Sequence, residues 1–187
     1  MGALTPLALV GGSILPKTAG AHNRPGAWRM DPVIEQATSP SPDVRDLIGE
    51  LNDTLAAAYP PHQRHGLALD QLFEPHMRFF LARLEGRAVG CGGVCLFVGY
   101  GEVKRMYTRP AARGRGIAKA LLARIEAAAR AAGIALLRLE TGVYQPEAVG
   151  LYRGTGFRPC AAFGAYAAMP AANIETSLFF EKSLRRG

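Results

Sequence analysis

Apolar and polar positions recur along this chain with two different periods. Between residues 44 and 59 the apolar side chains return every three or four positions, which is the spacing of one face of an α-helix. This stripe consists of Val44, Leu47, Ile48, Leu51, Leu55 and Ala58. The preceding SPSPD offers a proline-containing turn and a capping residue, so we expect an amphipathic helix to begin there. Residues 67–74 predict a second, shorter helix.

The middle of the chain has the pattern of β-strands. Residues 78–84, 87–99 and 101–108 are three apolar runs that only short turns separate. Connections this short join antiparallel neighbours, so the runs predict a meander. A further short strand is expected at residues 32–38, before the first helix.

A helical period returns after the meander. Residues 116–132 are rich in alanine, and Gly133 after them is typical of a helix C-terminus. The predicted apolar stripe is Ile117, Leu121, Ile125, Ala128 and Ala132. The remaining expected elements are a strand at residues 134–141, a helix at 145–155 with Pro146 in its first turn, and strands at 156–160 and 177–184. This order predicts an α/β fold with a mixed, mostly antiparallel central sheet of about six to seven strands flanked by helices.

The composition fits one folded domain. The chain has 187 residues, of which 49% are hydrophobic, and its apolar runs end before the roughly 18 residues that a membrane span needs. We expect residues 31–187 to form that domain. Residues 1–30 are rich in Gly, Ala and Pro and have no stable period, so we expect a disordered or loosely docked extension. A secretory signal and a folded subdomain are the competing interpretations of this segment.

Three cysteines, an odd number, suit a reducing compartment, and we expect a cytoplasmic protein. Cys91 and Cys95 would lie roughly 13 Å apart on a strand, too far to share a zinc ion. We therefore expect no metal site.

Positive charge is concentrated in the second half of the chain. Residues 101–187 carry 14 Lys or Arg against 6 Asp or Glu, whereas residues 1–100 carry 8 against 9. This imbalance predicts an anionic partner. Nucleic acid is the weaker choice, because the chain shows neither interleaved aromatic residues nor a recognition-helix pattern.

The sequence RGRGIAK, residues 113–119, stands between a predicted strand and a predicted helix. It fails the G-x-G-x-x-G dinucleotide pattern, whose third glycine would fall on Lys119, and the chain has no Walker A string. Glycines at a helix N-terminus still let backbone amides approach a phosphate. An exposed basic cap is the alternative, although arginines there oppose the helix dipole unless an anion compensates.

With its neighbouring segments, this loop resembles the GNAT N-acetyltransferases. R-G-R-G-I-A fits the family's acetyl-CoA signature, GEVKRMYTRP its fourth strand, LLRLET its fifth, and LYRGTGF its L-Y-x-x-x-G-F string. The resemblance covers roughly residues 34–184, and the YPP…RHG and LETGVYQPEA strings point to small bacterial members. It implies the GNAT fold and acetyl transfer from acetyl-CoA by direct attack of an amine.

The resemblance also implies site residues. Those expected to bind the acetyl-CoA cosubstrate are Met106, Tyr107, Thr108, Arg113, Gly114, Arg115, Gly116, Ile117, Ala118 and Lys119. Tyr152 matches the frequent general acid, although it could be only a core residue. Glu102 matches the general base of some members, but Lys104 on the same strand face would weaken it, and Glu140 is the competing base.

The acceptor side is expected to be built from the less constrained segments. His62 and His65 in a proline-rich loop, and Phe163 and Tyr166 before the last strand, are candidates for it, with surface or packing roles as alternatives. The expected acceptor is a primary amine of a small molecule. The alternatives are a protein N-terminus or lysine, and a catalytically silent CoA-binding module. Similar proteins are often dimers, so a homodimer is also compatible with the resemblance.

Overall fold

The structure is a computed structural model, and it describes residues 31–185. The expected N-terminal extension at residues 1–30 lies outside the described residues. All the strands and helices expected from residue 32 onward fall within them.

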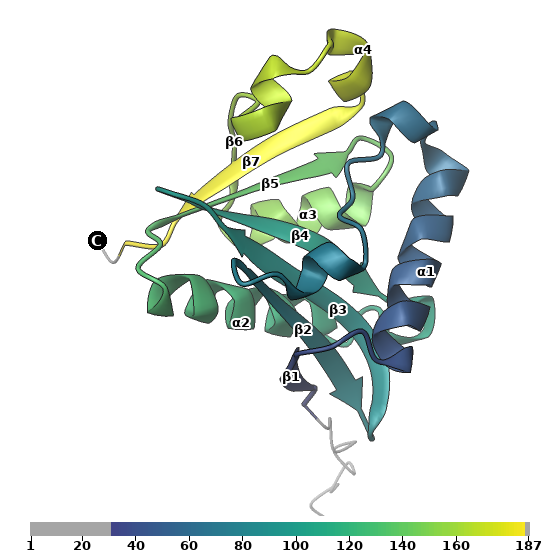
Figure 1. The fold of residues 1–187 in the computed structure, drawn as a ribbon. Coiled ribbons are helices and arrows are strands. Elements are labelled where there is room, and N and C mark those ends of the chain that lie inside the picture. Colours follow the sequence, from purple (N-terminus) through teal and green to yellow (C-terminus); the bar gives the residue numbers. More distant parts are fainter. Residues whose placement is uncertain (1–30, 186–187) are drawn as a thin grey trace, which may run out of the picture.

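Seven strands form one mixed sheet in the order β1-β2-β3-β4-β5-β7-β6 (Figure 1). They are β1 (Val33–Ala37), β2 (Met77–Leu84), β3 (Arg87–Leu96), β4 (Gly101–Thr108), β5 (Leu136–Gly142), β6 (Arg158–Pro159) and β7 (Ser177–Ser183). The β4–β5 pair is parallel, and the other neighbouring pairs are antiparallel. The expected mixed, mostly antiparallel sheet is thus confirmed, including the meander of β2, β3 and β4.

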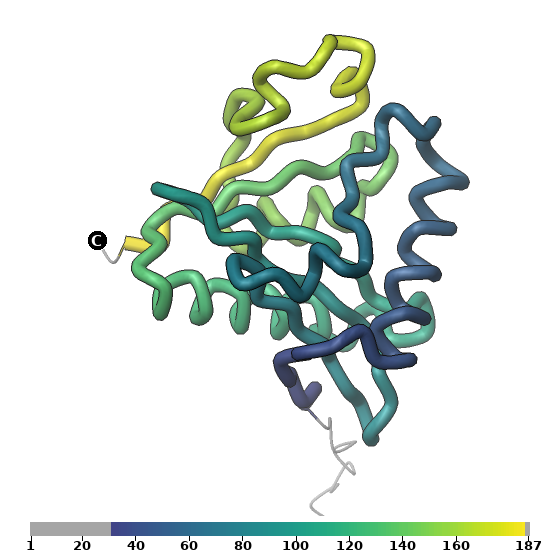
Figure 2. The backbone as a smooth tube through the Cα atoms, in the orientation of Figure 1, coloured from purple at the N-terminus to yellow at the C-terminus, as the bar shows by residue number. Residues whose placement is uncertain are grey.

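Helices cover both faces of this sheet. They are α1 (Pro42–Ala58), α2 (Ile117–Ala131), α3 (Pro146–Gly154) and the single-turn α4 (Ala171–Ile174). α1 lies on one face, and α2 and α3 lie on the other, as the ribbon and the tube both show (Figures 1 and 2). α1 begins as expected, because the Ser41 side chain accepts a hydrogen bond from the Val44 amide and Pro42 occupies the first turn.

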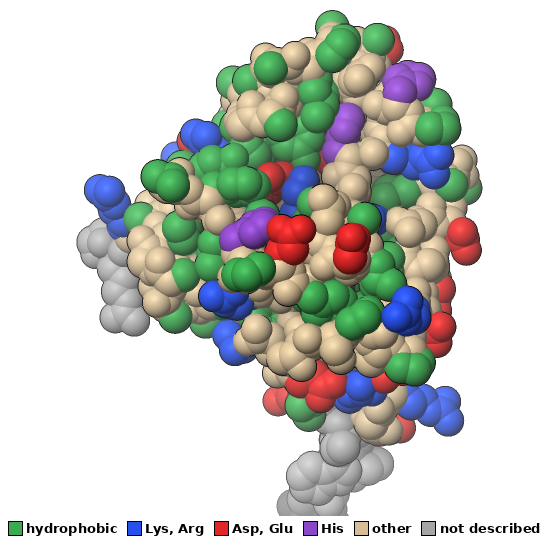
Figure 3. Space-filling view, in the orientation of Figure 1, with side chains coloured by type: hydrophobic (Ala, Val, Ile, Leu, Met, Phe, Trp, Pro, Cys, Tyr) green, Lys and Arg blue, Asp and Glu red, His purple; other side chains and the backbone are tan. Residues whose placement is uncertain are grey.

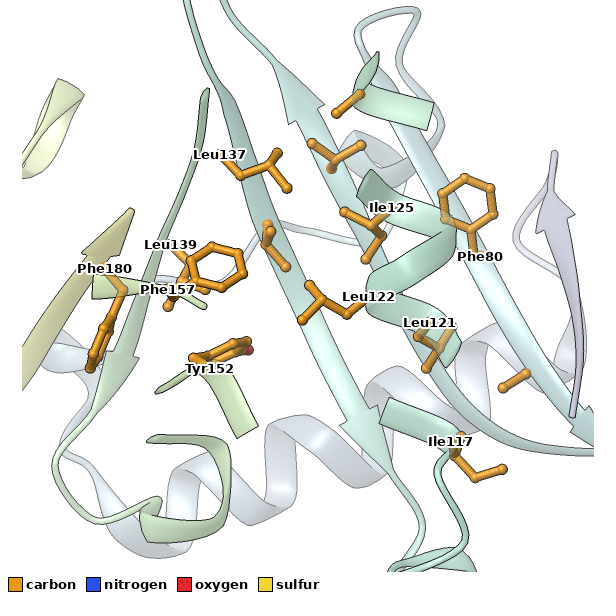
Figure 4. Close-up of a cluster of buried hydrophobic side chains, with 14 of the residues drawn as sticks. Phe80, Ile117, Leu121, Leu122, Ile125, Leu137, Leu139, Tyr152, Phe157 and Phe180 are labelled. Atoms are coloured by element: carbon orange, nitrogen blue, oxygen red, sulfur yellow. The ribbon is translucent and has the colours of Figure 1, made fainter. Parts of the chain in front are cut away.

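The larger hydrophobic core lies between the sheet and the α2–α3 face. Figure 4 shows side chains of α2 facing those of the central strands, with Tyr152, Phe157 and Phe180 grouped at the side of β5. A second cluster joins α1 to the opposite face through Val44, Leu47 and their neighbours. The sheet is therefore buried on both sides, which fixes the positions of β4 and β5 in the middle of the molecule.

Three short features differ from the sequence-based expectations. The segment 67–74 forms only a 3-10 turn at Asp70–Phe73, because Pro75 restricts Glu74 to an extended conformation. The strand expected at 156–160 has two residues, since Pro159 has no amide hydrogen for a longer ladder. On α2 the core residue is Ala129 and not Ala132, which is exposed and lies beyond the last helical residue.

Candidate active site

β4 and β5 pair only over their first residues. Their parallel register runs through three pairs and ends at Val103 with Leu139. Beyond that point β4 stays paired with β3 as far as Thr108, and β5 stays paired with β7 as far as Gly142. The two strands therefore part, and each presents one edge to the gap between them. We call these two edges, residues 104–108 and 140–142, the inner edges.

A β-bulge in β4 lies just beyond the point of parting. Arg105 and Met106 together stand opposite the single residue Gly92 of β3, and Arg105 has a φ of 57°. Regular alternation would direct Arg105 into the α2 core. The bulge instead turns it toward α1, where its Nη1 donates a 2.7 Å hydrogen bond to Asn52 Oδ1. Gly92 leaves room for the Met106 side chain, which a Cβ at this position would meet.

A cavity occupies the gap between the inner edges. It is lined by Met106 of β4, Glu140 of β5 and Tyr152 of α3, and by Tyr59 and His65 from the end of α1 and the loop after it. The structure thus brings together one expected cofactor-binding residue, one expected acid and the competing base.

Tyr152 is both a core residue and a cavity residue. Its side chain is 5% exposed, and its ring centroid lies 5.7 Å from that of Phe157 and 6.5 Å from that of Phe180 (Figure 4). Burial, and secondarily the nearby Glu140 carboxylate, raise the pKa of Tyr152. The hydroxyl therefore keeps its proton at neutral and moderately alkaline pH.

Glu140 lies on the inner edge of β5. One of its carboxylate oxygens accepts a 2.7 Å hydrogen bond from Ser177 Oγ of the neighbouring strand β7. Burial raises the pKa of Glu140 above its ordinary value, against the opposing effects of the Ser177 hydrogen bond, His65 and Lys104. A carboxylate whose pKa is raised is a stronger base than an exposed one.

Glu102 lies in a different environment from Glu140. It is 5% exposed, its Oε1 lies 2.6 Å from Lys104 Nζ, and it accepts a 2.9 Å hydrogen bond from Tyr166 Oη. Lys104 Nζ also donates to Tyr166 Oη over 2.6 Å. The three side chains form a closed triangle, and Glu102 is absent from the described residues that line the cavity. The ion pair with Lys104, expected from the shared strand face, is present.

The loop after α1, residues 60–67, spans the open side of the gap. Gln63 Nε2 donates to the Ala172 carbonyl over 3.1 Å, and His65 Nε2 lies 3.0 Å from the Asn173 carbonyl oxygen. At its other end, Arg105 donates a hydrogen bond to the Leu67 carbonyl. We call this segment the bridging loop, because it ties the α4 region to β4. In Figure 3, histidine, acidic and basic side chains gather on this face of the molecule.

The glycine-rich turn before α2 has the conformation that the sequence suggests. Gly114 and Gly116 have φ values of 73° and 82°, and a Cβ at either position would meet nothing within 4 Å. The positive φ, and not crowding, therefore requires glycine here. α2 begins at Ile117 with neither a side-chain cap nor an acidic residue in this described turn. Its positive dipole end is thus available to an anion.

The other expected cofactor-binding residues lie around this turn and along β4. Arg113, Arg115 and Lys119 are exposed. The Tyr107 side chain is directed to α1, where its hydroxyl donates to Glu50 Oε2 over 3.2 Å, so only its backbone belongs to the inner edge. Of the two loop histidines, His65 lines the cavity and His62 is exposed.

Two charged cavity residues were missed by the sequence analysis, namely Arg64 of the bridging loop and Arg105 of the bulge. A signal for Arg105 does exist, because an arginine at a core-facing position of a strand opposite a glycine pair is typical of a bulge. Arg64 has no comparable signal, since one basic residue in a polar loop is ordinary.

Residues 31–185 contain neither a metal-binding cluster nor a membrane-spanning helix. No group of three or more His, Cys, Asp or Glu in this part of the chain could hold a metal ion. None of its helices is both long and apolar enough to cross a membrane. Cys91 and Cys95 are free and buried in β3, as expected for structural thiols.

Comparison with known proteins identifies the family. Residues 45–157 match the Acetyltransferase (GNAT) family. An IAA acetyltransferase of Azospirillum brasilense is 48% identical over 143 residues, which are 75% of this chain and 90% of that protein. The uncharacterized N-acetyltransferase YsnE of Bacillus subtilis is 32% identical over 145 residues, covering 75% of this chain and 92% of that protein.

Solved structures agree with the sequence matches. A Klebsiella pneumoniae protein assigned as an acyl-CoA N-acyltransferase is 31% identical, with a TM-score of 0.66 over 84% of this chain and 99% of that one. N-acetylglutamate synthase of Neisseria gonorrhoeae, solved with coenzyme A and N-acetyl-glutamate, shares the fold at 19% identity, with a TM-score of 0.65 over 82% of this chain and 36% of that one. The sequence match, the named relatives and the parted sheet together show that this chain belongs to the GNAT family of acetyltransferases.

Proposed function

We propose that this enzyme transfers the acetyl group of acetyl-CoA to a primary amine of a small molecule. The observation that carries this proposal is the gap between β4 and β5, which has a half-buried base, Glu140, and a buried acid, Tyr152, on one cavity. Acetyl-CoA supplies the acetyl thioester. The protein positions the two substrates and handles the protons.

The cofactor-binding surface would combine two backbone features. The first turn of α2 offers amide donors and a positive dipole end, with Arg113, Arg115 and Lys119 around it, so it fits the CoA pyrophosphate. The inner edge of β4, residues 104–108, has no strand partner on its β5 side in the described sheet. It can hydrogen-bond the pantetheine chain and polarise the thioester carbonyl through an amide. No step of this binding requires a metal.

Glu140 is the base that the geometry favours. As the amine nitrogen bonds to the acetyl carbon, its proton passes to the Glu140 carboxylate, directly or through water. Glu140 lies on the cavity and has a raised pKa, whereas Glu102 does not line the cavity and is held by Lys104 and Tyr166. Glu102 would then be a positioning residue, which holds Lys104 and Tyr166 on the acceptor side.

Tyr152 would act as the acid. When the carbon–sulfur bond breaks, the leaving thiolate needs a proton or a hydrogen-bond donor. The Tyr152 hydroxyl, which the raised pKa keeps protonated, can donate a hydrogen bond to the thiolate from the cavity wall. A proton that it passes to the sulfur is replaced through solvent as Glu140 releases the proton taken from the amine, so both groups return to their starting states. The name of the Azospirillum relative, an IAA acetyltransferase, supports acetyl transfer to a small acceptor.

The following measurement tests the proposed reaction. The full chain with acetyl-CoA and a panel of primary amines should release free thiol above the amine-free rate. Tyr152→Phe should lower kcat by at least about tenfold, because it removes one donor to developing negative charge, while the Kd of acetyl-CoA stays nearly constant. Absence of thiol release with every amine would contradict transfer to an amine, and full activity of the phenylalanine variant would contradict the acid.

Gly116→Val tests the role of the turn before α2. Valine is strained at a φ of 82°, so the first amides of α2 should move and the Kd of acetyl-CoA should rise at least about tenfold. Gly86→Val is the matched control, because Gly86 has a φ of 78° and equally open surroundings in the β2–β3 turn. Titration calorimetry should show loss of affinity in the first variant only. Equal affinities would show that the turn does not bind CoA.

Glu140→Gln tests the base. We expect kcat/KM to fall by about 100-fold. In the wild type, kcat/KM should rise with pH as the Glu140 carboxyl loses its proton, and the variant should lack this rise. A raised pKa also means that the folded state favours the protonated carboxyl, so its contribution to stability falls as pH rises from its unfolded pKa through its folded pKa. The neutral glutamine should therefore raise Tm at pH 7 relative to the wild type.

Glu147→Gln, at an exposed position of α3, is the control and should change neither quantity. An active Glu140→Gln enzyme with an unchanged pH profile would exclude Glu140 as the base and favour Glu102.

A further inference from the structure

Arg64 and Arg105 line the same cavity as the proposed catalytic groups, and neither forms an ion pair within residues 31–185. Three of the four other half-buried arginines in residues 31–185 differ in this respect, and the fourth, Arg78, donates instead to two backbone carbonyls. Arg83, Arg109 and Arg138 each lie beside a carboxylate, at distances between their nitrogen and oxygen atoms of 2.6 to 3.2 Å. The two cavity arginines therefore bring positive charge that the described protein does not neutralise.

The Nε atoms of Arg64 and Arg105 are the two buried side-chain nitrogen or oxygen atoms of the described residues that have no hydrogen-bond partner. A buried donor without a partner is unfavourable, typically by about 1–3 kcal/mol, and native proteins rarely keep one without a reason. Two such donors on one cavity wall indicate a ligand that carries acceptor atoms.

Arg105 is held firmly in this position. Its Nη1 bonds to Asn52 and its Nη2 to the Leu67 carbonyl, and its guanidinium lies so close to Gly66 that a Cβ there would come within 2.5 Å of it. Both acceptors, the Asn52 amide oxygen and the Leu67 carbonyl oxygen, are neutral, so they do not neutralise the positive charge of the Arg105 guanidinium. Burial lowers the pKa of Arg105, which is the effect expected of a desolvated cation that lacks an anionic partner.

Arg64 lies on the bridging loop, two residues before Gly66. Its side chain makes no hydrogen bond to the described residues, while its backbone is fixed by a 3.3 Å bond from its amide to the Pro61 carbonyl. A second, adjoining cavity is lined by both arginines with Asn52, Leu55, Pro61 and Gly66, and no acidic residue contributes to it. The arginine side of the site thus presents positive charge and amide groups without a competing carboxylate.

Glu140 lines the first cavity together with these arginines and Lys104, so that cavity has one carboxylate and three basic side chains. Lys104 is already paired with Glu102, which leaves the two arginines as the basic groups without an acidic partner in the described residues. An anion near Glu140 would be repelled, whereas an amine would be attracted. An anion near Arg64 would gain a charge-assisted, bidentate hydrogen bond from a planar guanidinium. The charges therefore match a molecule that carries an amine at one end and an acidic group at the other.

Resting on the proposed function, we propose that the acceptor is an amino acid, a small amine that also carries a carboxylate, and that Arg64 binds this carboxylate with Arg105 beside it. The amine then points to Glu140, and the bridging loop closes over the carboxylate end. The acetyl group that is transferred carries no charge and so does not need two arginines beside it. A carboxylate on the acceptor explains why both arginines lie next to the site without acidic partners.

The test compares each acceptor with its own carboxamide. Thiol release is measured with acetyl-CoA and the L-α-amino acids, β-alanine and γ-aminobutyrate, and with the amide of each, which keeps the amine and removes the negative charge. For at least one pair, we expect kcat/KM for the acid to exceed that for the amide by about tenfold or more, the usual difference for a charged hydrogen bond. Amides used as well as the acids, or no turnover of any acid, would overturn the assignment.

Arg64→Met keeps most of the side-chain stem and should reduce the acid-to-amide ratio of the best pair by about tenfold or more. Arg87→Met, at an exposed position at the start of β3, changes the net charge equally and should leave the ratio unchanged. Arg64→Lys should restore part of the preference, because it returns the charge without the fork. A ratio that Arg64→Met does not change would also overturn the assignment, even where overall activity falls through a structural effect.

Calorimetric binding of acetyl-CoA to the same proteins separates this inference from the proposed function. Intact binding with acetylation of neutral amines alone would remove the carboxylate assignment and leave the acetyltransferase proposal in place. Failure to bind acetyl-CoA would remove the proposed function itself. A rise in the Kd of acetyl-CoA in Arg64→Met would mean that the arginine serves a CoA phosphate, and this outcome too overturns the assignment.

Discussion

The parting of β4 and β5 is the constraint on which the rest of the structure depends. Two parallel strands that stayed paired would satisfy each other's backbone groups and leave no space between them. Here the pairing ends at Val103, and both strands continue while held only by their outer neighbours. Buried backbone donors and acceptors must find partners. The inner edges therefore need water or a chain-like ligand, and catalytic side chains placed beside them meet that ligand.

Several local features keep the gap open and shaped. The bulge at Arg105 interrupts the side-chain alternation of β4, so that the successive side chains of Lys104 and Arg105 both lie on the α1 face of the sheet. Gly142 at the end of β5 allows the Tyr59 ring to lie against its backbone, and the Tyr59 hydroxyl accepts a 2.9 Å hydrogen bond from the Tyr144 amide. α1 is thus joined to both strands, and the bridging loop that follows it is held over the gap.

The fold was predictable because its signals are local and repeated. The helices follow from apolar stripes with caps, and the strands follow from apolar runs between turns. The turn before α2 was predictable for a related reason, since its backbone has a positive φ at positions 114 and 116, which glycine adopts readily and few other residues tolerate. These features are encoded within a few neighbouring residues, and the sequence displays them directly.

The chemistry of the site was less predictable because it depends on contacts between distant segments. Glu102 and Glu140 look alike in the sequence, and both lie on predicted strands. Their difference comes from Tyr166, which is 64 positions from Glu102, and from the burial of Glu140 between β4, β7 and the bridging loop. The role proposed for Arg64 also depends on the folded structure. Arg64 lines the cavity and forms no ion pair within residues 31–185, and its neighbours in sequence indicate neither property.

The central claim is that the inner edge of β4 and the first turn of α2 hold acetyl-CoA through backbone amides. Amide hydrogen exchange of the full chain, with and without saturating acetyl-CoA, measures these groups directly. We expect protection to rise most at residues 104–108 and 114–119, while the β1–β2 edge stays unchanged. Unchanged exchange in both segments, or protection confined to other parts of the chain, would contradict the account.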